Sequence, residues 1–346
     1  MTSLMRAEIG QQPDALRRTI DALLPRTADL ANLAAETRQV LFIARGSSDN
    51  AAVYGRYLVE AHAGRLATLA APSIATTYRR RLDLSGVLAV AISQSGKTEE
   101  IVETLDWAAG CGARTVAITN GAVSPLAEAA EVALITQAGE EKAVPATKTY
   151  TTQLAALSVL GLGLGADVAA DDLRRVPDEV AGLIEATEAS PALPRIVAEL
   201  ADVPGAVVSG RGIAFGTALE LALKIKEACY LHAMGLSYAD LLHGPIAVVD
   251  AQTPALLVAA DSGPTLPGTI ALAERVRGAG APAYGVGGGA GLAEACTAAL
   301  PGPGLPEWVA PLGLIVPGQI LVENLARRLG LDPDVPRGLN KVTQTT

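Results

Sequence analysis

The chain of 346 residues carries a net charge of −9, and half of its residues are hydrophobic. Its longest basic run is Arg79 to Arg81, and aromatic residues make up 3% of it, so nucleic acid is not an expected partner. The N-terminus has no apolar core of signal-peptide length, and the longest apolar stretches elsewhere are broken by glycine or charge well short of a membrane span. We therefore expect a cytoplasmic protein with no membrane partner.

Cysteine and histidine are both rare in this chain. Cys111, Cys229 and Cys296 are far apart and form no C-x-x-C pair, which predicts reduced residues in the core. With three histidines in all, a histidine-based metal site has few ligands, and we predict neither a metal nor a cofactor. The glycines of 210–216 are spaced G-x-G-x-x-x-G, which departs from the G-x-G-x-x-G of dinucleotide-binding loops.

Strand-like and helix-like segments alternate along the first half of the chain. This βα order predicts a parallel sheet with helices on both faces. The expected strand and helix pairs are 40–48 followed by 49–64, then 67–80, 87–105 and 114–130.

The segment Val87 to Leu105 joins a buried strand to a helix through a polar loop. Thr98 is the expected N-cap, and the loop before it carries the hydroxyls of Ser93 and Ser95 and the amide of Gln94. Ligands bind at the carboxyl ends of parallel strands, and helix N-termini suit anions. We interpret the loop as a phosphate cradle. The alternative is an ordinary turn whose hydroxyls only cap the helix.

The second half of the chain repeats the pattern of the first at an offset of 166 or 167 residues. Arg45-Gly46 corresponds to Arg211-Gly212, and Ser95-Gly96 to Ser262-Gly263, which predicts a duplicated α/β domain. In the second copy Asp261 replaces Gln94, and a carboxylate repels phosphate, so we expect the anion site in the first copy.

The predicted organisation has five parts. They are an N-terminal helical segment (1–35), a first α/β domain that binds phosphate (36–165), a helical connection (166–195), a second α/β domain (196–330) and a C-terminal tail (331–346).

A mostly apolar helix is predicted over residues 217–234. Glu220, Lys224 and Glu227 lie along one face of it. Two interpretations remain open, a solvated row of ion pairs or a buried group for acid–base chemistry.

Single histidine and lysine residues complete the candidates. His243 is expected in a loop before Gly-Pro and a strand, where it could move a proton near neutral pH, whereas His62 and His232 are expected to pack or cap within helices. The tail is polar, and Lys341 in it could bind an anion or form a Schiff base.

These motifs resemble a known family, the double sugar-isomerase (SIS) domain proteins. The likeness is to the isomerase half of glutamine:fructose-6-phosphate amidotransferase and to the SIS-type glucosamine-6-phosphate deaminases. The motifs are RGSSD, SQSGKT, AGEEKAVPATKTYTTQL, ALKIKEACYLHA, LHGP and PRGLNKVTQT. The resemblance implies an α/β protein of two tandem SIS domains, each a parallel sheet flanked by helices in a flavodoxin-like three-layer sandwich.

The resemblance also implies roles for individual residues. Glu227 would move a proton between C1 and C2 with Lys224 nearby, Lys341 would engage the open sugar, and His243 would open the ring from the neighbouring subunit of a homodimer. Sugar and phosphate would be held by Gly46, Ser47, Ser48, Ser93, Gln94, Ser95, Thr98, Val144, Ala146 and Thr147.

This chain departs from the amidotransferase pattern at three places. Pro145-Ala146 replaces the Ala-Ser of a VAST motif, Lys97 replaces a glutamate, and Thr2 stands where the glutaminase half would have its cysteine. We therefore expect deamination of glucosamine 6-phosphate to fructose 6-phosphate. The alternatives are an aldose–ketose isomerase or fructosamine-phosphate deglycase, and a non-catalytic module that senses phosphosugars.

Overall fold

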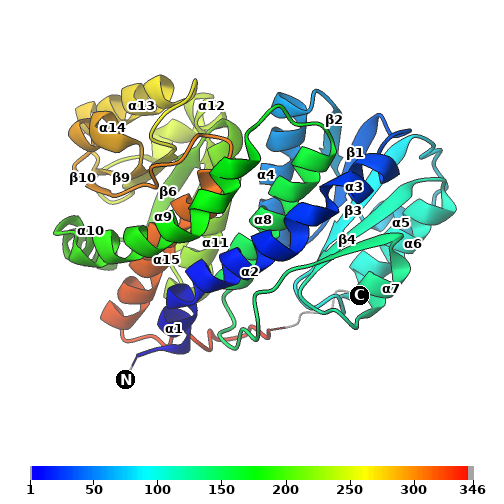
Figure 1. Cartoon of the computed structure of the whole chain (residues 1–346). Coiled ribbons are helices and arrows are strands. Elements are labelled where there is room, and N and C mark those ends of the chain that lie inside the picture. The colour runs from blue at the N-terminus through cyan, green and yellow to red at the C-terminus, as the bar shows by residue number, and fades with distance from the viewer. Residues whose placement is uncertain (1, 342–346) are drawn as a thin grey trace. The chain divides into compact units, whose positions relative to one another are not determined.

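The computed structural model describes residues 2–341, which form two compact units, each with a five-stranded parallel sheet (Figure 1). The N-terminal unit comprises residues 14–141, 148–174 and 340–341. The C-terminal unit comprises residues 2–13, 142–147 and 175–339.

The N-terminal unit follows the predicted alternation of strands and helices. Its elements are α2 (Gln12–Leu23), η1 (Leu24–Arg26), α3 (Thr27–Leu33), β1 (Gln39–Ile43), α4 (Ser47–His62), β2 (Leu66–Leu69), α5 (Ser73–Thr76), β3 (Val87–Ile92), α6 (Glu99–Gly110), β4 (Arg114–Thr119), α7 (Pro125–Ala129), β5 (Val132–Ile135) and α8 (Lys148–Gly163). The sheet has the order β2-β1-β3-β4-β5, as in flavodoxin-like folds.

Helices cover both faces of this sheet, because its strands are apolar on both sides (Figure 1). On one face, Ala91 of β3 lies in a core cluster with Ile101 and Leu105 of α6. On the other face α4 and α8 pack very closely. A Cβ atom at Gly55 of α4 would lie 2.8 Å from Cδ2 of Leu157 in α8.

The C-terminal unit repeats the same strand order. Its elements are α1 (Leu4–Gly10), most of α9 (Ala170–Ala189), α10 (Ala192–Ala201), β6 (Gly205–Gly210), η2 (Gly212–Ala214), α11 (Phe215–Cys229), β7 (His232–Ser237), α12 (Tyr238–Leu242), η3 (Pro245–Val248), β8 (Ala255–Ala259), α13 (Leu266–Gly278), β9 (Ala283–Gly287), α14 (Gly289–Ala295), β10 (Ala298–Leu300) and α15 (Pro311–Arg328). The sheet has the order β10-β9-β8-β6-β7. When its strands are numbered from β6 as strand 1 and the sheet is read from β7, this order is again 2-1-3-4-5.

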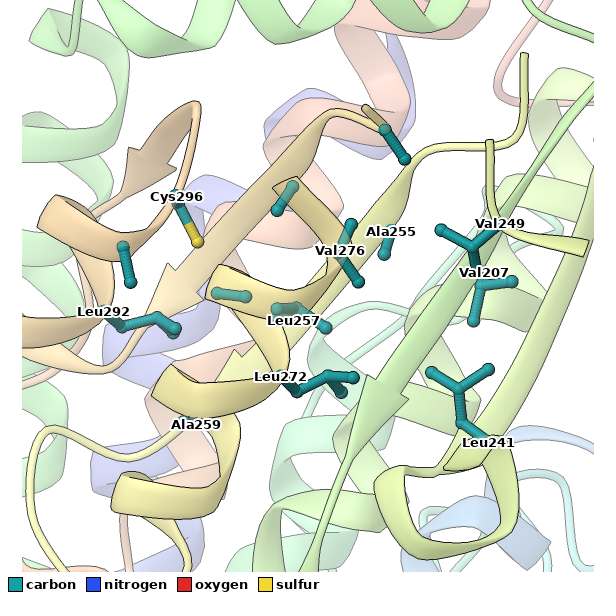
Figure 2. Packing of buried hydrophobic residues seen from close by; sticks show 14 residues of the cluster. Val207, Leu241, Val249, Ala255, Leu257, Ala259, Leu272, Val276, Leu292 and Cys296 are labelled. Atoms are coloured by element: carbon teal, nitrogen blue, oxygen red, sulfur yellow. The ribbon is translucent and has the colours of Figure 1, made fainter. Parts of the chain in front are cut away.

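Figure 2 shows the core on one face of the second sheet. Val207 of β6 and Leu257 of β8 pack there with Leu272 and Val276 of α13 and with Leu292 of α14. All five side chains are at most 2% exposed. Parallel sheets with helical layers, the predicted class of fold, are thus confirmed in both units.

The prediction of one helix through 217–234 is wrong beyond Cys229. Tyr230 has φ of +57°, a left-handed conformation that ends α11. The following residues form β7, which pairs in parallel with β6. His232 therefore lies on an exposed edge strand and does not pack or cap within a helix.

The strand expected directly after His243 is also absent. Gly244 has φ of +129°, and Pro245 begins the short 3-10 helix η3. Proline has no N–H to donate to a sheet, which favours this outcome. The next strand, β8, begins only at Ala255.

The three cysteines are buried and unpaired, as predicted. Burial raises the pKa of both Cys229 and Cys296 to about 12. Among residues 2–341, no helix combines the length and the apolarity that crossing a bilayer requires.

Replacing Gly205 on β6 by alanine tests the pairing of β6 with β7. The new Cβ atom would lie 2.3 Å from the backbone oxygen of His232, so the strands would have to separate. We expect Gly205→Ala to lower the free energy of unfolding in urea by about 1–3 kcal/mol. The control Gly182→Ala lies in α9, where a Cβ meets nothing within 4 Å, and should gain about 0.5–1 kcal/mol. Equal stability of the two variants would contradict this pairing.

Candidate functional site

Two loops of the N-terminal unit carry the predicted phosphate-binding residues. They follow β1 and β3, which are adjacent and parallel, so both loops leave the same edge of the sheet. Ser47 and Ser48 open α4, and residues 93–98 connect β3 to α6. The strand order reverses between β1 and β3, which is where doubly wound sheets bind their ligands.

Neither helix at this edge is capped by a side chain. Gly46 is the N-cap residue of α4. Thr98 is the N-cap residue of α6, as predicted, but its side chain makes no capping hydrogen bond; Oγ1 lies 3.4 Å from Oγ of Ser93 instead. The first N–H groups of a helix have no partner within it, and they favour an anion. The geometry therefore favours the cradle over the simple capped turn.

Two serine hydroxyls of the cradle accept hydrogen bonds from N–H groups. Oγ of Ser95 accepts from the backbone N of Lys97 at 3.2 Å, and Oγ of Ser48 accepts from Nε2 of Gln153 at 3.0 Å. A hydroxyl that already accepts still has its proton to donate. Phosphate oxygens are acceptors, so these serines present the polarity that a phosphate requires.

The backbone of the cradle loop is held by its neighbours in the N-terminal unit. The carbonyl oxygens of Gln94 and Gly96 accept from the backbone N atoms of Asn120 and Leu126, each at 3.1 Å. Gly96 has φ of +65°, and a Cβ there would lie 2.3 Å from Oγ of Ser124. Only glycine suits this position.

Charged residues flank the cradle. Arg45 forms two hydrogen bonds of 3.0 Å with the carboxylate of Glu100. Burial raises the pKa of Asp49 in the first turn of α4, and Arg45 partly offsets that rise. Lys97 is exposed.

In the C-terminal unit, α11 holds a lysine between two carboxylates. Glu220 and Lys224 are at most 1% exposed, and Lys224 Nζ lies 3.5 Å from Oε1 of Glu220. Nζ also contacts Oε2 of Glu227, whose side chain is 21% exposed. The interpretation of this helix face as a solvated row of ion pairs is therefore wrong for Glu220 and Lys224. Glu227, whose side chain is partly exposed, is accessible to a ligand in solution.

The end of α11 is fixed by the segment that leads to the tail. Arg337 donates its backbone N–H to Oη of Tyr230 at 2.7 Å, and its guanidinium lies 4.3 Å from the centre of that ring. Tyr230 is the residue at which α11 ends. This contact therefore supports the helix end that carries Glu227.

His243 lies at the end of α12 and is exposed. Its backbone N–H donates to the backbone oxygen of Asp240 at 3.1 Å. Its imidazole lies at the surface of the chain.

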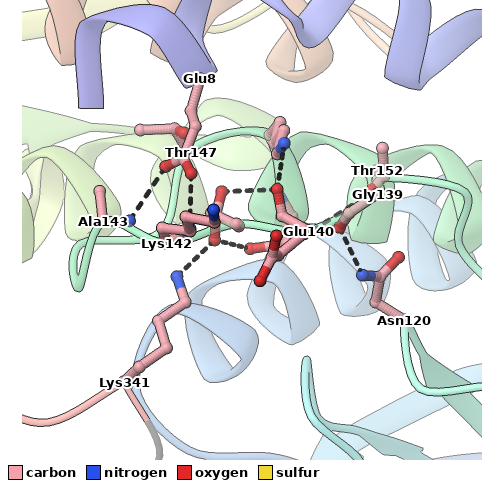
Figure 3. A network of polar contacts seen from close by, with 12 residues as sticks. Glu8, Asn120, Gly139, Glu140, Lys142, Ala143, Thr147, Thr152 and Lys341 are labelled. Carbon is pink, nitrogen blue, oxygen red and sulfur yellow. Dashed lines mark hydrogen bonds and ion pairs between the residues drawn. The ribbon is translucent and has the colours of Figure 1, made fainter. Parts of the chain in front are cut away.

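The predicted sugar-lining residues lie in the segment 142–147, which is bound into the C-terminal unit. The carboxylate of buried Glu8 accepts from the backbone N atoms of Lys142 and Ala143 (Figure 3). Val144 donates its N–H to the oxygen of Asp334 at 2.9 Å. Ala146 is half-buried, and Thr147 is fully buried.

The structure pairs Lys341 with a residue that sequence reasoning missed. Its Nζ lies 2.6 Å from Oε2 of Glu141, a fully buried carboxylate of the N-terminal unit (Figure 3). Thr149 at the start of α8 adds a backbone and a hydroxyl hydrogen bond to that carboxylate. Glu141 stands in the motif AGEEKAV, but adjacent Glu140 has the same charge, so nothing in the pattern singles out one of them.

The corresponding loop of the C-terminal unit is occupied by carboxylates. Oδ1 of Asp261 accepts from the backbone N of Gly289 at 3.0 Å, and burial raises the pKa of this aspartate. A carboxylate oxygen of Glu307 would lie 2.7 Å from a Cβ at Gly263, and Oε1 accepts from Thr265 at 3.2 Å. This loop therefore carries negative charge where the cradle carries donors.

Comparison with known proteins shows the family. The SIS domain model matches residues 33–162. A protein from Silicibacter pomeroyi, provisionally named a phosphosugar isomerase, is 32% identical with a TM-score of 0.87, over 96% of this chain and 100% of that one. The chain belongs to the SIS-domain family. The family model identifies one SIS domain, which lies in the first half of the chain.

Two further relatives bear on the chemistry. Glutamine–fructose-6-phosphate aminotransferase of Methanothermobacter thermautotrophicus is 34% identical over 97% of this chain. The chain spans only 56% of the length of that relative. The glucosamine-6-phosphate deaminase of Thermotoga maritima is 25% identical, with a TM-score of 0.78, over 99% of this chain and all of that one.

Removing the amine of Lys341 tests its pairing with Glu141. Lys341→Ala leaves a buried carboxylate without its counter-ion, and we expect a loss of about 1–3 kcal/mol in the free energy of unfolding. The control Lys226→Ala removes an exposed lysine of α11 and should change stability by less than about 0.5 kcal/mol. Urea unfolding measures both, and equal effects would contradict the pairing.

Proposed function

We propose that this chain is a phosphosugar isomerase-type enzyme that converts glucosamine 6-phosphate and water into fructose 6-phosphate and ammonia. One observation carries the proposal, the buried Lys224 of α11 that contacts the partly exposed carboxylate of Glu227. A carboxylate with an ammonium partner and access to solutes suits proton transfer at carbon.

The reaction would proceed on the open chain of the sugar. Glu227 removes the C2 proton of the aldehyde form while a proton passes from the substrate's ammonium group to O1, which gives an enolamine. Glu227 then returns its proton to C1. The resulting C2 iminium adds water, and the C–N bond breaks to release ammonia and leave the ketone of fructose 6-phosphate. Lys224 contacts the Glu227 carboxylate and holds it in place on α11.

The cradle of the N-terminal unit would bind the phosphate of this substrate. Ser48, Ser93, Ser95 and Thr98 supply hydroxyl donors, and the starts of α4 and α6 supply backbone N–H groups. Binding energy from a group remote from the reacting carbons can hold the open chain in position. Lys341 would release Glu141 and contact the sugar instead.

The names of the relatives support this class of reaction, and one of them supports deamination. The Thermotoga maritima deaminase matches over its whole length. The Silicibacter pomeroyi protein is named for phosphosugar isomerisation and is more similar in sequence, so an aldose–ketose isomerase is the second candidate. A deglycase acting on fructosamine phosphates would use the same residues.

We further propose that the C-terminal unit is a second, diverged SIS domain and that the enzyme is a homodimer. The equal strand order of the two sheets supports the first point. The exposure of His243 supports the second, since this imidazole would open the sugar ring in the partner subunit.

Glu227→Gln tests the proposed base. An amide cannot carry the proton, so we expect kcat for ammonia release from glucosamine 6-phosphate to fall about 100- to 10,000-fold. The control Glu103→Gln changes an exposed residue of α6 and should keep wild-type kcat. Ketose formation from glucose 6-phosphate without ammonia release from the amino sugar would favour the isomerase. Phosphosugar binding without turnover of any substrate would favour the sensor module.

Mixing two inactive variants tests the role of His243 across subunits. Glu227→Gln and His243→Ala homodimers should each be nearly inactive. Co-expression should restore about a quarter of wild-type kcat per subunit, because half of the subunits are in heterodimers and each heterodimer has one intact site. Ammonia release by the co-purified mixture measures this. An inactive mixture whose subunits exchange normally would contradict the shared site.

A further inference from the structure

A buried side chain of α8 contacts the cradle. Gln153 is 2% exposed, and its Nε2 donates to Oγ of Ser48 at 3.0 Å. Ser48 itself is 8% exposed and stands in the first turn of α4. The two residues are 105 positions apart in the sequence and belong to the same unit.

The packing of α4 on α8 fixes this contact. A Cβ atom at Gly55 would lie 2.8 Å from Leu157, and one at Gly161 would lie 2.7 Å from Leu58, so the helices touch at two places along their length. A second buried hydrogen bond joins them, with Oη of Tyr54 and Oγ of Ser158 2.8 Å apart. The Gln153 amide is therefore held in place beside Ser48.

The direction of the hydrogen bond determines what Ser48 can do. A serine hydroxyl has one proton and two lone pairs, and Gln153 occupies one lone pair with an N–H. The Ser48 proton has no acceptor among residues 2–341. It therefore remains available to a ligand that only accepts, as an ionised phosphate does.

We propose that Gln153 is a positioning residue that keeps the hydroxyl of Ser48 oriented as a hydrogen-bond donor to the substrate phosphate. The inference rests on the proposed function, since it assumes that the cradle binds a phosphate. Gln153 does not touch the ligand and acts through Ser48. The buried Oε1 of Gln153 has no partner among the described residues, so the hydrogen bond to Ser48 is the polar contact that its amide makes there.

Gln153→Met tests this role because methionine fills a similar volume without an N–H. We expect inorganic phosphate, measured by calorimetry, to bind about tenfold more weakly. The KM for glucosamine 6-phosphate should rise by a similar factor with little change in kcat. The matched control Tyr54→Phe removes the other buried hydrogen bond between α4 and α8. It should lower stability but leave phosphate affinity unchanged.

A double-variant cycle shows whether the effect passes through Ser48. In a Ser48→Ala background, adding Gln153→Met should weaken phosphate binding no further. An undiminished additional loss, an equal loss in Tyr54→Phe, or an unchanged phosphate affinity in Gln153→Met would each overturn the inference.

The same measurements separate this inference from the proposed function. Wild-type protein that does not bind phosphate would contradict the cradle, and with it both proposals. Phosphate binding that follows the expected pattern, in a protein that releases no ammonia, would overturn deamination and leave the role of Gln153 intact.

Discussion

The ammonium group of Lys224 is almost completely buried, and the chemistry of α11 depends on the two carboxylates beside it. Desolvating an unpaired charge costs several kcal/mol, so Lys224 needs at least one partner wherever α11 packs on its sheet. Glu220 supplies the fully buried partner, and Glu227 supplies one that reaches the surface. The Glu227 carboxylate therefore lies next to an ammonium group that is buried and also paired with Glu220.

The two units use one architecture for opposite electrostatic purposes. Gly46 and Gly212 have φ of +58° and +59° after the first strand of each sheet, and Gly96 and Gly263 both have positive φ after the third. The cradle of the N-terminal unit presents hydroxyl protons, because N–H groups already occupy the acceptor side of Ser48 and Ser95. The matching loop of the C-terminal unit contains Asp261 and contacts Glu307. The two loops therefore share backbone geometry and differ in the polarity of the side chains that they carry.

Local patterns in the sequence determined the order and type of most elements. The strand predicted at the start of 87–105 is β3, Val87–Ile92, and the helical connection predicted over 166–195 contains α9, Ala170–Ala189. These predictions succeed because an apolar run or a helical period reports directly which face of an element will be buried. The same reasoning placed Glu220, Lys224 and Glu227 on one face of a helix. It could not determine that this face is buried, because burial depends on what packs against the helix.

Contacts between distant residues were decided only by the tertiary structure. The left-handed conformation of Tyr230, which ends α11, coincides with its contact to Arg337, and no local signal marks that position. Glu141 acquires Lys341 as its partner across 200 residues, and Ser48 acquires Gln153 across 105. A sequence specifies which side chains can donate, accept or carry charge. Which of them meet is settled only when the parallel sheet fixes where each helix begins.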